Sequence, residues 1–466
     1  MSSESTYDSP ALPLFPLAVT AFEEFMLRDD RASLPMSFFI EIGLTGALNR
    51  PQLELAFHRA LQRHPMLSAR IRSGWLHDVW VEGTADARIS WLNTSDQLPG
   101  PSDRWIDLKK NGGLRCWIIS ADQSHRVIFQ FHHASTDGIG ALRFIGDLLA
   151  LYGLATATGD QEHPVLEPID HHLLPRRGDY WQSGRPSNFW PRLWFRLREV
   201  LGQFPCPLAR PRGAKKSADP ETQTASPSQR LFITRVLENR ELRRLNKAAS
   251  DRAITPNDIL TWAMFQTLQH WNELHGAAKP GTVYRIILPT SVRTPDYDNC
   301  SASNILAYSV MTKCGREISD SKLLSVIAQE SAVSVSGQEA GMVLMCLNAG
   351  RRVPGLLAGF TALPLCLSTA VLANVGDVRR QLCNQFPLKQ GKIVAGTVTM
   401  EYLLGVAPIR PKTNLAISLG KYAGKLFINL NLNPESYSDA EAEVLADLFV
   451  EQIRKIQPAQ DDEPTA

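Results

Sequence analysis

The sequence predicts an α/β protein built from two lobes that a linker joins. Strand-like and helix-like runs alternate over about residues 16–154 and again over residues 231–456. Residues 159–229 between them are rich in Pro, Arg and Ser, which is typical of a connecting segment. A length of 466 residues fits two large domains or three of average size. We therefore expect an N-terminal lobe over residues 1–158, a linker over 159–229 and a C-terminal lobe over 230–466.

The N-terminal lobe shows two helical patterns and one hairpin pattern. Residues 51–63 place their apolar side chains on one helical face. The alternating runs 114–119 and 126–132 are separated by a polar turn and predict a hairpin. A second apolar helix is expected to follow Asp137-Gly138 and to end near Tyr152.

The C-terminal lobe repeats this mixture of helices and strands. We expect a helix over 255–271, a strand over 282–289, two strands within 412–432, and a final helix through 453 that the capping box Ser438–Glu441 begins.

Two segments raise the question of membrane contact. Residues 190–201 mix Trp and Arg, and we interpret them as a helix packed on the core, with docking on a membrane surface or a partner as the alternative. The charge-free run 353–376 is long enough to cross a bilayer. Its prolines and glycines favour a buried helix followed by a buried strand over residues 368–375.

Composition narrows the function classes. Lys+Arg 49 against Asp+Glu 47 leaves a net charge of +2, without the basic excess of a nucleic-acid binder. The seven cysteines are widely spaced and form no C-x-x-C pair, which disfavours a disulfide framework and fits a reducing compartment. Residues 1–13 lack the features of a signal peptide. We expect a cytoplasmic protein, with peripheral membrane contact as the open alternative.

The most informative cluster is FHHASTDG, residues 131–138. His132 and His133 end an alternating strand and fall on opposite faces, so they are poorly placed to chelate one metal, and no metal site is expected. The proton equilibrium of histidine lies near neutrality, as a general base requires. Asp137 stands at a turn, where its carboxylate can orient a histidine or pair with an arginine. The alternative is a pair of core histidines beside a turn aspartate.

HHASTDG resembles the HHxxxDG signature of the condensation-domain superfamily. That group includes nonribosomal peptide condensation domains, wax ester synthase/diacylglycerol acyltransferases, polyketide-associated acyltransferases and, more distantly, chloramphenicol acetyltransferase. Five further segments are similar to family elements in the family's order: the opening strand region over 25–46, the RHxxLR-like element over 61–71, the helix start at 255–260, PTSVR at 289–293 with Asn304, and ANVG at 373–376. The resemblance implies an α+β sandwich of two chloramphenicol acetyltransferase-like lobes with an interlobe tunnel.

The resemblance also implies a role for each motif residue. His133 corresponds to the catalytic histidine, His132 to a supporting one, Asp137 to a salt-bridged structural aspartate, and Gly138 to the glycine that keeps the entrance open.

The arginine partner of Asp137 is left open by the sequence. Arg63 and Arg70 both lie in the RHxxLR-like element, and Ser68 occupies its usual second arginine position.

Two residues of the C-terminal lobe match family positions near the channel. We expect Asn374 and Arg293 to bind substrate, with a purely structural role as the alternative. Ala373 replaces the family's serine and removes its hydroxyl.

The implied function is acyl transfer from a thioester to an alcohol or amine, with neutral His133 accepting the acceptor's proton. No bound cofactor is expected, and coenzyme A or a phosphopantetheine carries the acyl group as co-substrate. The partners are then a small acyl acceptor and the thioester, with a carrier protein acting in trans as one donor. Two alternatives remain: a stand-alone nonribosomal-peptide-type condensation domain, and a non-catalytic binding protein with the same fold.

Overall fold

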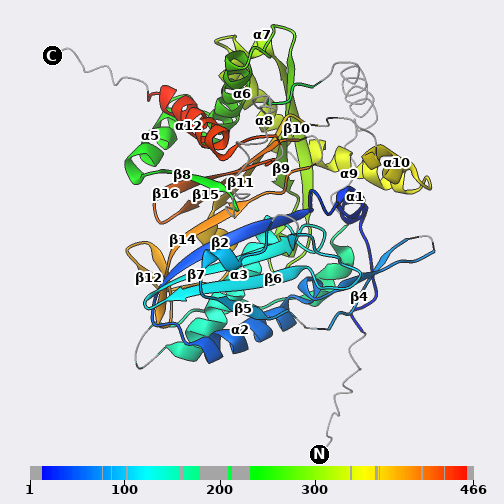
Figure 1. The fold of residues 1–466 in the computed structure, drawn as a ribbon, viewed down its shortest axis with the longest axis vertical. Coiled ribbons are helices and arrows are strands. Elements are labelled where there is room, and N and C mark those ends of the chain that lie inside the picture. The colour runs from blue at the N-terminus through cyan, green and yellow to red at the C-terminus, as the bar shows by residue number, and fades with distance from the viewer. Residues whose placement is uncertain are drawn as a thin grey trace, which may run out of the picture.

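The computed structural model describes residues 13–178, 208–211 and 231–458, apart from short gaps at residues 76, 85–86, 101–102, 158, 160–161, 336–337, 363–365, 367, 411–412 and 435. The helix predicted over residues 190–201 lies outside the described residues. What is described forms two halves, one above the other in Figure 1, each with its own sheet and helices. The predicted α/β class with two lobes is therefore confirmed.

The first sheet occupies the lower half of Figure 1. Among the described residues it has seven strands, namely β2 (Ser37–Gly46), β5 (Ile89–Leu92), β6 (Leu114–Ala121), β7 (Ser124–His132), β12 (Leu388–Lys389), β13 (Lys392–Ala395) and β14 (Val398–Val406). Their order is β12-β13-β14-β2-β7-β6-β5. Helices α2 (Arg50–Arg63) and α3 (Gly138–Thr156) pack on each other and on one face of this sheet.

The second sheet occupies the upper half of Figure 1. Its described strands are β8 (Ile233–Leu237), β9 (Val283–Ser291), β10 (Leu306–Cys314), β11 (Ala370–Asp377), β15 (Leu415–Tyr422) and β16 (Lys425–Leu432), in the order β10-β9-β11-β15-β16-β8. Helices α5 (Asn239–Ser250), α6 (Pro256–Leu274), α8 (Leu323–Val335) and α12 (Asp439–Lys455) cover its outer side.

The remaining elements lie at the edges of the two halves. They are β1 (Leu17–Ala18), β3 (Arg70–Arg72) and β4 (Val79–Val81), which form a small sheet, and helices α1 (Ala21–Asp29), α7 (Gly315–Ile318), α9 (Gln338–Arg351), α10 (Leu356–Ala362) and α11 (Val378–Gln381). The opening segment 25–46, expected to be a strand region, is a strand only from Ser37. Its start belongs to α1, because Thr20 and Glu23 form a capping box that begins a helix.

The helices and strands that the local patterns predict within the described residues are present. Alternation in β7 places Val127, Phe129 and Phe131 in the core under α2 and α3, while Ile128 packs on the opposite face. The β6–β7 turn is tighter than expected, because both strands extend to Asp122-Gln123.

Capping boxes likewise mark the starts of two helices. Thr255 and Asp258 begin α6, and Ser438 and Glu441 begin α12.

One long connection crosses between the halves. Strands β12–β14 follow β11 of the second sheet in the chain, yet β14 pairs antiparallel with β2 of the first. The division at residues 158 and 229 stays a prediction, but sheet membership does not follow it, since residues 388–406 complete the first sheet.

One described helix, α3, is long and apolar enough to span a membrane by length and composition. Its most apolar window is 72% buried inside the protein, so packing against the first sheet already accounts for its composition. The charge-free run 353–376 forms α10 and β11, as the predicted helix and strand. The helix is only half buried, because Leu357 faces the core while Leu356 is exposed.

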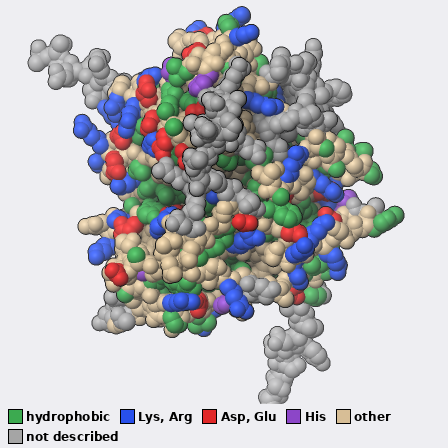
Figure 2. Space-filling view, in the orientation of Figure 1, with side chains coloured by type: hydrophobic (Ala, Val, Ile, Leu, Met, Phe, Trp, Pro, Cys, Tyr) green, Lys and Arg blue, Asp and Glu red, His purple; other side chains and the backbone are tan. Residues whose placement is uncertain are grey.

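On the face shown in Figure 2, blue and red side chains are interspersed over both halves. This distribution matches the near-zero net charge.

Candidate active site

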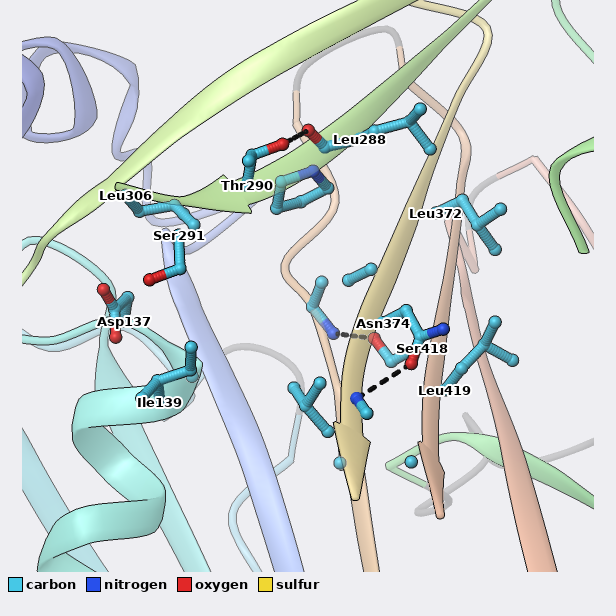
Figure 3. Close-up of a pocket in the computed structure, with 18 of the residues that line it drawn as sticks. Asp137, Ile139, Leu288, Thr290, Ser291, Leu306, Leu372, Asn374, Ser418 and Leu419 are labelled. Atoms are coloured by element: carbon cyan, nitrogen blue, oxygen red, sulfur yellow. Dashed lines mark hydrogen bonds between the residues drawn. The ribbon is translucent and has the colours of Figure 1, made fainter. Parts of the chain in front are cut away.

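A cavity of about 560 Å³ lies between the two halves. Phe38, His133 and Gly138 line it from the first half, and Leu288, Leu372 and Leu419 from the second. Figure 3 shows Asp137 and Ile139 at the start of α3 facing the strands that carry these leucines. The described lining contains neither lysine nor arginine, so the cavity suits uncharged parts of a ligand.

His133 follows the last residue of β7 and is 9% exposed. Its main-chain N–H donates to Met36 O (2.8 Å), and its carbonyl accepts from Asn304 Nδ2 (2.7 Å). The ring packs edge-on against Phe38, with 5.1 Å between centroids. The His133 backbone is thus held from both halves of the molecule, and its ring packs against the first.

The two ring nitrogens of His133 differ in their surroundings. Nδ1 is buried and meets no partner in good hydrogen-bond geometry among the described residues. Nε2 forms no hydrogen bond to another described residue, and the His133 side chain lines the cavity. Burial is the strongest influence on the ring and lowers its pKa, although its own main chain and the Asp137 carboxylate act in the opposite direction. His133 is therefore neutral at neutral pH, as a proton acceptor must be.

His132 has a different environment, as the strand alternation predicts. Its Nδ1 accepts the N–H of Ala134 (3.1 Å), and its Nε2 lies 3.5 Å from Asp30 Oδ2. Burial favours the neutral acid form of Asp30, but bonds from His132, Met36 and Trp105 outweigh it and lower the pKa of this carboxyl. His132 is thus held in the interior, away from the cavity.

Asp137 is saturated with hydrogen bonds. Oδ1 accepts from Gly140 N (2.8 Å) and Arg293 (2.9 Å), and Oδ2 accepts from Ile305 N (2.9 Å) and Arg293 (2.8 Å). Burial opposes its charge, but Arg293 and these N–H groups outweigh burial and hold the pKa of Asp137 below its ordinary range. Its carboxylate therefore holds structure and has no lone pair left for proton transfer.

Arg293 is the arginine partner that the sequence left unassigned. Its side chain is buried against Asp137 and also donates to Ser303 O and Ile305 O. It does not line the cavity, so the geometry supports the structural alternative over the substrate contact we expected. Arg63, one of the two candidates, pairs instead with Asp147.

Gly138 and Asn374 do line the cavity, as predicted. A Cβ on Gly138 would meet only Val375 Cγ1, at 3.8 Å, so glycine there leaves room rather than relieving backbone strain. Asn374 on β11 donates to Asn257 Oδ1 (3.1 Å) and accepts from Gly376 N (2.9 Å). Both polar ends of this amide are thus engaged within the protein.

The sequence did not indicate that the loop after Arg293 positions His133 through Asn304. Asn304 was matched to the family pattern without a role, and Asp30 was not singled out. The same loop is fixed by His64, whose Nδ1 accepts from Ala302 N (2.8 Å), and by Arg143, which donates to Tyr297 O and Cys300 O. The RHxxLR-like element contains His64, which could have directed attention to it.

The described residues contain no group of three or more His, Cys, Asp or Glu side chains placed to hold a metal. The cysteines of this part of the chain are all free, and those at 116 and 300 are buried.

Comparisons with known proteins identify the fold. No family model matches the chain. Two curated proteins of Mycobacterium tuberculosis, the uncharacterized proteins MT2362 (strain CDC 1551 / Oshkosh) and Rv2305 (strain ATCC 25618 / H37Rv), are each 22% identical over 387 residues, which cover 78% of this chain and 83% of theirs.

Three solved structures resemble nearly the whole chain. The TRI3 trichothecene 15-O-acetyltransferase of Fusarium sporotrichioides has a TM-score of 0.65 and 15% identity, covering 95% of this chain and 94% of its own. The starter condensation domain of rhizomide synthetase RzmA, a mutant in complex with C8-CoA and Leu-SNAC, has a TM-score of 0.65 and 14% identity, covering 96% and 97%. Polyketide synthase associated protein 5 of Mycobacterium tuberculosis has a TM-score of 0.60 and 14% identity, covering 94% and 98%. The chain therefore has the fold of the condensation-domain and chloramphenicol acetyltransferase-like superfamily.

Proposed function

We propose that the protein is an acyltransferase that moves an acyl group from a thioester to an alcohol or amine, with His133 as the general base. The observation that carries this proposal is the position of His133: an imidazole that burial keeps neutral and that lines a cavity between the two halves. The fold, shared with acetyltransferases and condensation domains, supports the same chemistry.

The reaction assigned to this geometry is direct transfer. Nε2 accepts the proton of the hydroxyl or amine while that group attacks the thioester carbonyl. As the tetrahedral intermediate collapses, the carbon–sulfur bond breaks and the protonated ring returns the proton to the leaving thiolate. The products are an ester or amide and a free thiol. Proton transfer by a positioned base contributes about 10²- to 10⁴-fold to the rate.

The residues that line the cavity indicate which part of the acyl thioester it can hold. Because the described lining lacks lysine and arginine, we assign the acyl group, the neutral pantetheine arm and the acceptor to the cavity, and the phosphates to its outside. Either coenzyme A or a carrier-bound phosphopantetheine meets this requirement. A solved neighbour that was crystallised with C8-CoA is consistent with the first.

The test is thiol release from a panel of acyl-CoA thioesters of different lengths, with alcohols and amines as acceptors. His133→Ala should lower kcat by about 10²- to 10⁴-fold in a protein that circular dichroism shows to be folded. The matched control is His58→Ala, which removes an exposed histidine of α2 and should keep full activity. Wild-type turnover by a folded His133→Ala variant would overturn the proposal.

The same assay separates the alternatives. Release that requires an acyl carrier protein would favour a stand-alone condensation domain. Binding of thioesters without release would favour a non-catalytic protein. Peripheral membrane contact stays a prediction, and cosedimentation with anionic liposomes tests it.

A further inference from the structure

A pair of polar side chains forms part of the cavity wall in the second sheet. Ser418 on β15 and Asn429 on β16 are direct cross-strand partners, and both line the cavity. Directly opposite residues project to the same face of a sheet, with Cβ atoms roughly 5 Å apart. The same row continues to Ala373 on β11 and Thr234 on β8. The hydroxyl that Ala373 lacks is thus present on the neighbouring strand, at Ser418.

Each of these two side chains has a hydrogen-bond donor that no described residue accepts. The Ser418 oxygen accepts from Ala407 N (2.9 Å), while its own O–H has no acceptor among the described residues. Asn429 Oδ1 accepts from the Thr234 hydroxyl (2.8 Å), which directs the amide nitrogen away from Thr234. No described residue accepts from that nitrogen, although Asn429 is only 2% exposed. Figure 3 shows Ser418 beside Leu419 and Asn374 at the cavity wall.

The surroundings of the pair exclude a charged ligand group. The charged residues in the described lining are Asp137, which pairs with Arg293, and Glu330, which pairs with Lys313. Leu403, Val406 and Leu419 also line the cavity and are apolar. A plain hydrocarbon placed here would remove water from the two donors without replacing its hydrogen bonds, which weakens binding by about tenfold or more per group.

We propose that Ser418 and Asn429 form a specificity subsite that hydrogen-bonds an uncharged oxygen of the substrate, such as a carbonyl, ether or hydroxyl oxygen, away from the reacting carbonyl. The subsite rests on the proposed acyltransferase function and deepens it, because it selects oxygenated substrates over plain alkyl ones. A site built around hydrogen-bond donors discriminates strongly against a ligand that lacks the matching acceptor.

The oxygen can belong to the acyl chain or to the acceptor, and two arms of one experiment distinguish these sources. In the first arm, octanoyl-CoA is compared with chain-matched thioesters that carry one ether or keto oxygen at successive positions, with a fixed acceptor. In the second arm, a plain alcohol is compared with keto- and ether-bearing alcohols of equal length, with a fixed donor. We expect kcat/KM to favour one oxygenated series by about tenfold or more.

Variants assign the preference to the pair. Ser418→Ala and Asn429→Leu should each reduce the ratio of kcat/KM for oxygenated over plain substrates severalfold. Ser325→Ala, which removes an exposed serine of α8, should retain the preference. Ser418→Ala alone suffices if Asn429→Leu does not fold. Equal kcat/KM for plain and oxygenated substrates, or an unchanged preference in Ser418→Ala, would overturn the subsite.

A binding measurement keeps this test separate from the proposed function. Calorimetric titration of folded His133→Ala with the same matched thioesters and alcohols reports affinity without turnover. Preferential binding of oxygenated ligands, lost in the His133→Ala/Ser418→Ala variant, would support the subsite even if no thioester were consumed by the wild type. Failure of turnover alone would overturn only the acyltransferase proposal. Equal or absent binding of both ligand series would overturn the subsite.

Discussion

Asp137 and Arg293 meet through two hydrogen bonds of 2.8 and 2.9 Å and join the two halves of the molecule beside the candidate active site. Asp137 caps α3, which packs on the first sheet, whereas Arg293 follows β9 of the second. Both side chains are almost completely buried. The pair therefore fixes the motif loop that carries His133 against the opposite half.

Removal of Arg293 should destabilise the fold. Arg293→Ala leaves a buried carboxylate without its counter-charge, which costs about 3–5 kcal/mol of unfolding free energy. Arg293→Lys should cost less, because one ammonium replaces part of the bidentate contact. The control Lys455→Ala breaks the exposed pair with Glu451 and should change stability by less than about 1 kcal/mol. Urea unfolding measures all three, and similar losses for Arg293→Ala and Lys455→Ala would contradict this role.

The same pair predicts how stability depends on pH. The folded-state pKa of Asp137 is lowered, so its contribution is fully present above the unfolded value of about 3.9 and is lost as the pH falls through the folded pKa. Asp137→Asn should flatten the acid-induced loss of unfolding free energy below about pH 4. Urea unfolding between pH 2 and 6 tests this, and parallel curves for variant and wild type would exclude Asp137 as the titrating group.

The rate of acyl transfer should follow the protonation of His133. Because the pKa of His133 is lowered by burial, kcat/KM should rise with pH, inflect below the ordinary histidine value of about 6.5 and stay level from pH 7 to 8. A pH–rate profile with a pH-stable thioester measures the inflection. An inflection above pH 7 would mean that another group limits the rate.

Asn304 should act by positioning His133. Its amide donates to the His133 carbonyl at 2.7 Å across the two halves. Asn304→Ala leaves that buried carbonyl without a donor, which costs about 1–3 kcal/mol of stability. A misplaced base should lower kcat by about tenfold or more with little change in KM. Retained kcat together with reduced stability would show that Asn304 is structural only.

Substitution by alanine should have a small effect on stability at Gly138 and a larger one at Gly140. Gly138→Ala adds a methyl in ordinary contact with Val375 and should change stability by less than about 1 kcal/mol, while it narrows the cavity and disfavours bulky substrates. At Gly140 the new Cβ would lie 2.3 Å from Thr136 Oγ1 and 2.9 Å from the Ser303 backbone. Gly140→Ala should therefore destabilise by about 1–3 kcal/mol. Thermal unfolding measures the loss of stability in each variant, and kinetics with substrates of two sizes test whether Gly138→Ala narrows the cavity. A larger loss of stability for Gly138→Ala than for Gly140→Ala would contradict the prediction.

Features set by near neighbours in the chain could be predicted from the sequence. Alternation predicts that His132 and His133 face different surroundings, and the capping box at Ser438–Glu441 predicts the start of α12. These features depend on backbone geometry within one element. The structure places them as expected.

Features that depend on distant pairing could not be predicted in the same way. Asp137 and Arg293 are 156 residues apart, and Asn304 is 171 residues from His133. Nothing in the local pattern around Arg293 distinguishes a buried ion-pair partner from a residue that binds substrate. The subsite proposed for Ser418 and Asn429 could not be predicted, because it depends on the strand register that places them side by side on the cavity wall.

The strand that crosses between the halves also constrains how the chain reaches its native state. Thr397, just before β14, bonds to Ala47, just after β2, and the two residues are 350 positions apart. Before β14 pairs with β2 during folding, the edge of β2 is unpaired and can form hydrogen bonds with another chain. Contacts between distant parts of the chain form late, because the loop they close must first lose its conformational entropy. The N-terminal half made alone should therefore aggregate rather than fold, and co-expression with the C-terminal half should rescue it.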